Sequence, residues 1–62
     1  MKRNELLKIL RRNGCYLKRE GANHSLWISS INGAIEAIPR HVEIPDILAK
    51  KIIKNLIAPN ND

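Results

Sequence analysis

The chain is organised around one segment, Arg19-Glu20-Gly21-Ala22-Asn23-His24-Ser25-Leu26-Trp27. Its centre, Gly21-Ala22-Asn23, has the composition of a tight turn, because glycine and asparagine tolerate backbone conformations that other residues avoid. Residues 24–29 then alternate with a period of two, which is typical of a half-buried strand. The segment therefore predicts a turn that leads into a strand, with His24 at the junction of the two.

Two further strands are predicted, one on each side of this segment. Residues 15–19 also show a period of two. Residues 34–38 follow Asn32-Gly33, a pair that favours a tight hairpin because both residues tolerate positive φ. Pro39 ends this third strand, since proline lacks the N–H that a ladder needs. Antiparallel pairing of the three strands is the simplest arrangement.

A helix is predicted before and after the strands. Residues 4–13 place leucines at helical spacing, with Asn4 as N-cap and Gly14 as the residue that ends the helix. Residues 45–57 form the second helix, whose apolar face consists of Ile47, Leu48, Ile52, Ile53, Leu56 and Ile57. The order helix, three strands, helix predicts an α+β domain of two layers, with both helices on one face of the sheet.

Length and composition limit the size and the surroundings of this domain. The chain has 62 residues, of which 44% are apolar, with one Trp, one Tyr and no Phe. We expect a single domain over residues 1–58, with a core built mainly from Ile and Leu, and a frayed tail at 59–62. No apolar run approaches the roughly 20 residues of a membrane span, and no signal-peptide pattern opens the chain, so we expect a soluble, cytoplasmic protein.

The charge is strongly positive for so small a body. Lys and Arg number 11 against 6 for Asp and Glu, which gives a net charge of +5. Such a field favours a polyanion as partner. Two alternatives remain open: the charge maintains solubility alone, or the partner is an acidic protein.

His24 is the leading candidate for chemistry. Imidazole exchanges protons near neutral pH, and RNA cleavage needs a group that takes a proton from a 2′-hydroxyl or gives one to the leaving oxygen. Arg19 or Lys18 could hold a phosphate beside it. The alternative is a strand-end histidine that forms local hydrogen bonds and has no other role.

The other possible ligands and bases are weaker candidates. His41 lies in the loop before the second helix, where it could orient His24, contact RNA or only order the loop. A zinc site is not expected, because zinc takes three or four protein ligands and the sequence offers no ligand motif. Cys15 is the single cysteine, which excludes an internal disulfide, and it is expected to be a small core residue.

Aromatic and basic side chains suggest two binding surfaces. Strand parity places Tyr16 and Trp27 on the sheet face away from the helices, where they could stack on bases or form a patch that a protein partner covers. We favour the protein partner, because the residues around them carry no positive charge. The candidate phosphate contacts elsewhere, for each of which a solvated role is the alternative, are Arg40, Lys50, Lys51 and Lys54.

Several motifs follow one another along the chain at characteristic spacing. They are Glu5-Leu6-Leu7-Lys8-Ile9-Leu10, Gly14 before an aromatic strand, Arg19-x-Gly21-x-x-His24, Ile38-Pro39-Arg40-His41, and a last helix rich in Leu, Ile and Lys. In their order, spacing and total length they resemble the HicA toxins of bacterial and archaeal type II toxin–antitoxin systems. The resemblance spans nearly the whole chain.

This resemblance implies a double-stranded-RNA-binding-domain-like α-β-β-β-α fold and an mRNA interferase activity. It implies that His24 is catalytic and that a HicB-type antitoxin covers the site. Ala22 is a departure, because many members have Ser or another polar residue there. Loss of that hydroxyl would weaken the activity or leave its role to Asn23. His41 corresponds to a frequent family histidine.

Three functions are consistent with these observations. The first is a metal-independent endoribonuclease toxin that needs no cofactor and acts on mRNA, with His24 as general acid/base. Arg19, Gly21 and Asn23 would shape the turn and position the phosphate, and the antitoxin would face Tyr16, Trp27 and His24. The second is a non-catalytic RNA-binding module, and the third is a small protein adaptor. The first is favoured, because a bare binding module has no need of a histidine at this turn.

Overall fold

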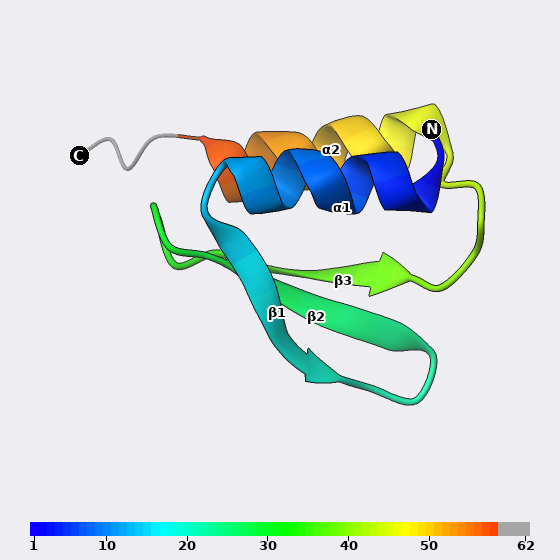
Figure 1. Ribbon diagram of the computed structural model, residues 1–62, viewed down its shortest axis with the longest axis horizontal. Coiled ribbons are helices and arrows are strands. Elements are labelled where there is room, and N and C mark those ends of the chain that lie inside the picture. The colour runs from blue at the N-terminus through cyan, green and yellow to red at the C-terminus, as the bar shows by residue number, and fades with distance from the viewer. Residues whose placement is uncertain (59–62) are drawn as a thin grey trace.

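The computed structural model describes residues 1–58 and contains a helix, three strands and a second helix in chain order (Figure 1). The elements are α1 (Arg3–Arg12), β1 (Cys15–Glu20), β2 (His24–Ser29), β3 (Ile35–Pro39) and α2 (Asp46–Ile57). The α+β class and the double-stranded-RNA-binding-domain-like order α-β-β-β-α are confirmed. The tail expected at residues 59–62 lies outside the described residues.

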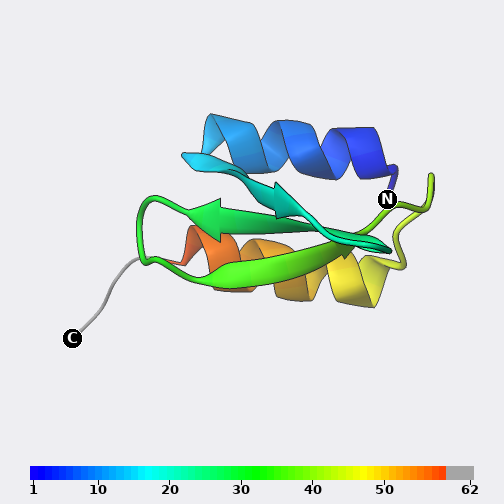
Figure 2. The same ribbon diagram turned by 90° about the horizontal axis from the view of Figure 1, so that it is seen from below.

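The sheet is open and antiparallel, in the order β1-β2-β3. Both helices lie side by side on one face of it, as Figure 1 and Figure 2 show from two directions. The central strand β2 begins at His24, which pairs with Pro39 at the end of β3. The fold therefore places His24 at one end of the sheet, next to the start of the β3–α2 loop. Within residues 1–58, neither helix is long and apolar enough to cross a bilayer.

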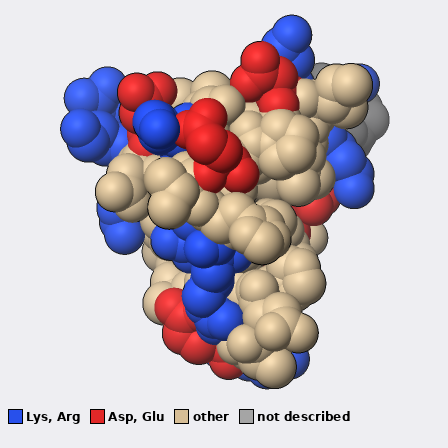
Figure 3. Space-filling view, turned by 90° about the vertical axis from the view of Figure 1, so that its right-hand side faces the viewer, with Lys and Arg blue, Asp and Glu red and all other residues tan. Residues whose placement is uncertain are grey.

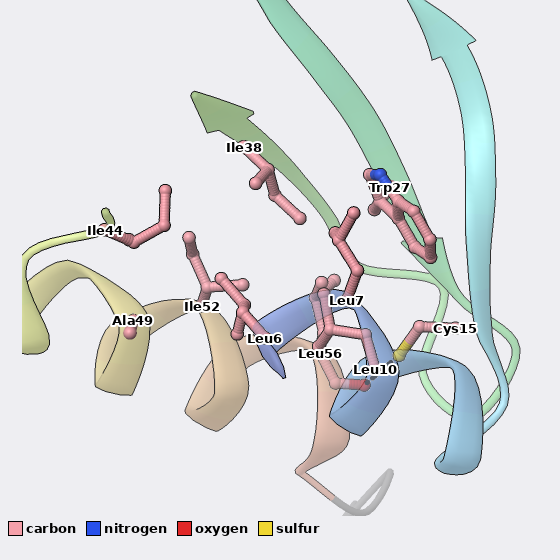
Figure 4. Packing of buried hydrophobic residues seen from close by; sticks show 10 residues of the cluster. All are labelled: Leu6, Leu7, Leu10, Cys15, Trp27, Ile38, Ile44, Ala49, Ile52 and Leu56. Carbon is pink, nitrogen blue, oxygen red and sulfur yellow. Dashed lines mark hydrogen bonds between the residues drawn. The ribbon is translucent and has the colours of Figure 1, made fainter. Parts of the chain in front are cut away.

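The core lies between the helices and the inner face of the sheet (Figure 4). Its buried members are Leu6, Leu7, Leu10, Cys15, Trp27, Ile38, Ile44, Ala49, Ile52 and Leu56. Aliphatic side chains dominate this set, and Cys15 is a small buried member of it, as predicted from the sequence. Burial raises the pKa of the Cys15 thiol, so this cysteine is held in its neutral form.

The sheet face assigned to Trp27 from strand parity is wrong. Trp27 is only 3% exposed and packs in the core, with the buried Ser25 and Ser29 on the same face of β2. Leu26 and Ile28 occupy the outer face instead. The indole buries more apolar area than either aliphatic side chain, and the serines are tolerated inside because they have hydrogen-bond partners. Trp27 is therefore not an exposed antitoxin contact, whereas Tyr16 does lie on the outer face and is 55% exposed.

Two further details, at the starts of the two helices, differ from expectation. Asn4 lies within α1, and the preceding Lys2 makes no side-chain cap. A backbone carbonyl takes the place of the cap, since that of Val42 accepts from the Arg3 N–H at 2.8 Å. Ile47 was expected on the apolar face of α2 but is 85% exposed. The buried face of α2 consists of Ala49, Ile52 and Leu56, which recur at helical spacing, and Ile47 does not lie on that face.

The β2–β3 connection is not the expected turn with two positive φ angles. Among residues 1–58, positive φ occurs at Gly14 and Gly33 and at no residue other than glycine. The Asn32 side chain instead bridges two elements: its amide donates to the carbonyls of Asn55 and Ala58, and its oxygen accepts from the Ala34 N–H. The loop is thus fixed by contacts to the end of α2. The positive φ of Gly14 confirms its expected place at the end of α1.

Candidate functional site

An open hollow of about 340 Å³ lies at the end of the sheet where β2 begins. His24 is exposed at its edge, supplied by the first position of β2. The lining comes from two segments far apart in the sequence, and consists of Ala22, Asn23, His24, Pro39, Arg40 and His41. The β1–β2 turn and the residues that follow β3 thus meet at one site, because His24 and Pro39 are paired across the sheet.

Arg40 closes the turn from the β3 side. Its Nη1 donates to the Ala22 carbonyl at 2.9 Å, and its Nη2 donates to the carbonyls of Gly21 and His24. The same nitrogen forms an ion pair with Glu20 Oε1 at 2.6 Å. A planar guanidinium with several fixed donors can serve such a set of acceptors. The side chain predicted to bind phosphate therefore also holds the turn in shape.

Gly21 permits the tightness of this turn. Its N–H donates to the His24 carbonyl at 2.7 Å. A Cβ added at Gly21 would lie 3.1 Å from that carbonyl oxygen, closer than ordinary van der Waals contact. A side chain here would push the His24 backbone away. The role predicted for Gly21 in shaping the turn therefore has a structural basis in the close approach of the two backbones.

A second layer of hydrogen bonds lies beneath the turn. Ser25 is 1% exposed, and its Oγ donates to Glu20 Oε1 at 2.7 Å. Arg3 reaches from α1, where its Nη2 donates to Ser25 Oγ at 3.1 Å and its Nε donates to the Pro39 carbonyl at 2.8 Å. The four side chains Arg3, Glu20, Ser25 and Arg40 form what we call the turn-anchoring network. It fixes the strand ends on both sides of His24 to helix α1.

Electrostatics within this network favour an ionised Glu20. The Ser25 hydroxyl, and after it the Arg40 guanidinium, hold the pKa of the Glu20 carboxyl below its usual range. Arg3 contributes in the same direction from farther away. Glu20 is thus a permanently charged anchor near neutral pH and not a proton-transfer group.

Sequence reasoning missed Arg3, Glu20 and Ser25 as parts of the site. Their partners in α1 and after β3 are distant in the sequence, so no local pattern reveals these contacts, although Ser25 and Glu20 are only five positions apart. One signal was present: Ser25 shares its strand parity with Trp27, and placing the tryptophan inside would also have placed Ser25 inside, in need of a partner.

Of the residues that the sequence predicted for the site, only some lie at the hollow. Asn23 and Arg40 line the hollow with His24, and Gly21 lies in the turn.

Arg19 and the α2 lysines are not part of the hollow. Arg19 is exposed on β1, opposite Leu26. Lys50, Lys51 and Lys54 are exposed on α2, in the other layer of the fold. Figure 3, which views the end of the molecule that carries the β1–β2 turn, shows a narrow basic strip on that face with acidic side chains above and below it. In residues 1–58, no group of three or more His, Cys, Asp or Glu side chains is placed to hold a metal ion.

Comparison with known proteins identifies the family. The family model described as the HicA toxin of bacterial toxin–antitoxin systems matches residues 3–56. The match extends over both helices and all three strands, and includes the anchored turn and both histidines. No significant match was found among curated proteins or among solved structures. The chain therefore belongs to the HicA toxin family of bacterial toxin–antitoxin systems.

Proposed function

We propose that this HicA-family toxin is a metal-independent endoribonuclease that cleaves mRNA, with His24 as a general acid/base. The observation that carries the proposal is the position of His24, which is exposed in an open hollow yet has its backbone held by Gly21 and Arg40. A proton-transfer group must be both reachable and fixed, because the geometry at the reacting atoms determines the rate.

The groups around His24 support an anionic substrate. Asn23 lines the hollow and offers an amide, and Arg19 adds a positive charge on the strand that leads into the turn. We assign phosphate contacts to these two residues and to the part of Arg40 that remains open to solvent. Asn23 would also take over the polar role that Ala22 cannot supply. The exposed Lys50, Lys51 and Lys54 of α2 would extend RNA binding away from the reacting bond.

A protein partner is implied by the family, since a toxin of such a system has an antitoxin. We propose that an antitoxin of the HicB type covers His24 and the outer face of the sheet. Tyr16, Ile28 and Ile35 lie next to one another across the three strands on that face, and they form what we call the outer apolar row. Two of its members are among the exposed large apolar side chains of the structure. Burying them would add to the stability of a small domain.

The proposal is tested by inducing the wild-type protein, His24→Ala and a matched control, Lys8→Ala, in bacteria. Lys8 is exposed on α1, outside the hollow. We expect wild type and Lys8→Ala to arrest growth and to degrade mRNA, and His24→Ala to do neither at equal protein levels. Equal loss of mRNA with His24→Ala would contradict the catalytic role. Intact mRNA with the wild type would indicate a binding module or an adaptor instead.

A further inference from the structure

The two histidines of the sequence line the same hollow. His24 and His41 are the only histidines in the chain, and both line the hollow at the end of the sheet. His24 comes from the β1–β2 hairpin and His41 from the loop after β3. Both side chains are exposed to solvent. The fold thus exposes two imidazoles to the same small volume, which no local sequence pattern indicates.

The loop that carries His41 is anchored on both sides of this residue. Before it, the Arg40 guanidinium is bonded to the turn that carries His24, and Arg3 bonds the Pro39 carbonyl. After it, the Val42 carbonyl accepts from the Arg3 N–H at 2.8 Å. These contacts order the loop through the neighbours of His41. The imidazole itself is therefore available for a ligand, although its backbone position is fixed relative to His24.

Other ionisable groups near the hollow are already engaged. Glu20 and Arg40 form an ion pair, and Arg3 is bonded to Ser25 and to the Pro39 carbonyl. Glu43 and Lys2, which adjoin the same loop, form a second ion pair at 3.0 Å. Imidazole is also the one side-chain type that ordinarily both gives and takes a proton near neutral pH. The two histidines are therefore the groups of this site best suited to proton transfer.

We infer that His41 is the second proton-transfer group of the reaction and that it forms an acid–base pair with His24. The inference rests on the proposed ribonuclease function. The 2′-oxygen forms a bond to phosphorus as one imidazole takes its proton. The bond from phosphorus to the 5′-oxygen breaks as the other imidazolium gives that oxygen a proton. The products are a 2′,3′-cyclic phosphate and a free 5′-hydroxyl, and one proton has been taken and one given.

The test separates the acid from the base with a substrate that needs no acid. A cleavage site is first mapped in a long transcript with the wild-type protein. An oligonucleotide with that site is then made with oxygen or with sulfur as the 5′-bridging atom, because a thiolate leaves without protonation. Wild type, His24→Ala, His41→Asn, His41→Gln and the control Lys8→Ala, at an exposed residue of α1 outside the hollow, are compared on both substrates. Thermal unfolding followed by circular dichroism monitors the fold of each variant.

We expect the histidine variants to cleave the oxygen substrate about 100-fold or more slowly than wild type, which is the usual contribution of one acid or base. With the sulfur substrate, near-wild-type cleavage should return for changes at one histidine and not at the other. His41 variants within about threefold of wild type on the oxygen substrate would overturn the inference alone. Rescue at both histidines or at neither would also overturn it. An inactive wild-type protein would overturn the proposed function, and the acid–base pair with it.

Discussion

Arg40 uses its guanidinium to hold the turn that presents His24. Its donors reach the carbonyls of Ala22, Gly21 and His24, as well as the Glu20 carboxylate. A lysine at this position would carry the same charge but could not reproduce the planar fork. The residue is therefore a positioning residue as well as a candidate phosphate contact. The two roles are separable, because positive charge alone is enough to contact a phosphate, whereas holding the turn requires the planar geometry of the guanidinium.

We predict that Arg40→Lys lowers the rate of RNA cleavage by about tenfold or more, because small displacements of a reacting group are costly. Arg40→Ala should be at least as slow. Both variants should lose only about 1 kcal/mol of unfolding free energy, since the bonds are partly solvated. Cleavage rates and thermal unfolding of the two variants and of the exposed control Arg12→Lys provide the check. A wild-type rate in Arg40→Lys would show that cleavage depends on the positive charge at this position and not on the geometry of the guanidinium.

Glu20 makes the stability of the turn depend on pH. Its pKa is lowered in the folded state by Ser25 and Arg40, so it stabilises the fold fully above its ordinary value of 4.5. That contribution is lost as the pH falls through the lowered folded-state pKa. We predict that the difference in Tm between wild type and Glu20→Gln is largest near pH 7 and closes on acidification. Thermal unfolding from pH 7 to pH 3, with Glu5→Gln as control, measures it, and a gap that stays constant would contradict the account.

The β2 strand shows what an alternating sequence pattern can predict about a single element and what it cannot. The pattern correctly identifies a strand from His24 to Ser29. It does not decide which side of the strand meets the helices, because both sides carry apolar residues. Strand parity predicts Trp27, which alternates with Ser25 and Ser29, on the outside, yet Trp27 is the residue of β2 whose burial removes most apolar surface from water. The average polarity of each face therefore gives the wrong orientation of β2. The size of the Trp27 side chain determines which face is buried.

The corrected placement of Trp27 predicts a large difference between two aromatic truncations. Trp27→Ala should lower the free energy of unfolding by about 3–5 kcal/mol, as expected for an aromatic residue lost from a core. That is most of the stability of a marginal small domain. Tyr16→Ala on the outer face should cost about 1 kcal/mol or less. Urea denaturation followed by circular dichroism compares them, and similar losses for the two variants would contradict the assignment of the faces.

Local chemistry was sufficient to predict the helices and strands and their order. Gly14, Pro39 and the Gly21 turn mark the boundaries of elements through properties of single residues, and they lie where the sequence placed them. The turn-anchoring network could not be predicted in the same way. Arg3 and Ser25 are 22 positions apart, and only the packing of α1 against the sheet brings them together. The same holds for Asn32, whose partners lie in α2 and at its end.

At the scale of the whole molecule, the helices cover one face of the sheet and leave the other open. The outer apolar row of Tyr16, Ile28 and Ile35 crosses all three strands there, and His24 points to the same side at the end of β2. A partner that covers this face would reach His24 and the outer apolar row together. Inhibition and binding by an antitoxin would then depend on one continuous surface.

We predict that Tyr16→Glu weakens binding of the antitoxin by at least about tenfold, because a charge would be buried in an apolar contact. Ile47→Glu is the control, since Ile47 is an even more exposed apolar residue on α2, away from the outer sheet face. Titration calorimetry with the purified antitoxin measures both. Equal affinities for Tyr16→Glu and wild type, or a loss confined to Ile47→Glu, would place the partner on another surface.

The most direct test of histidine-dependent, metal-independent catalysis is cleavage of a mapped RNA by the purified protein in the presence of excess EDTA. We predict that wild type cleaves at an undiminished rate and leaves 2′,3′-cyclic phosphate and 5′-hydroxyl ends. His24→Ala, folded to the same extent, should be slower by about 100-fold or more. Cleavage that stops on chelation, or that proceeds equally well in His24→Ala, would contradict a histidine-dependent, metal-independent ribonuclease.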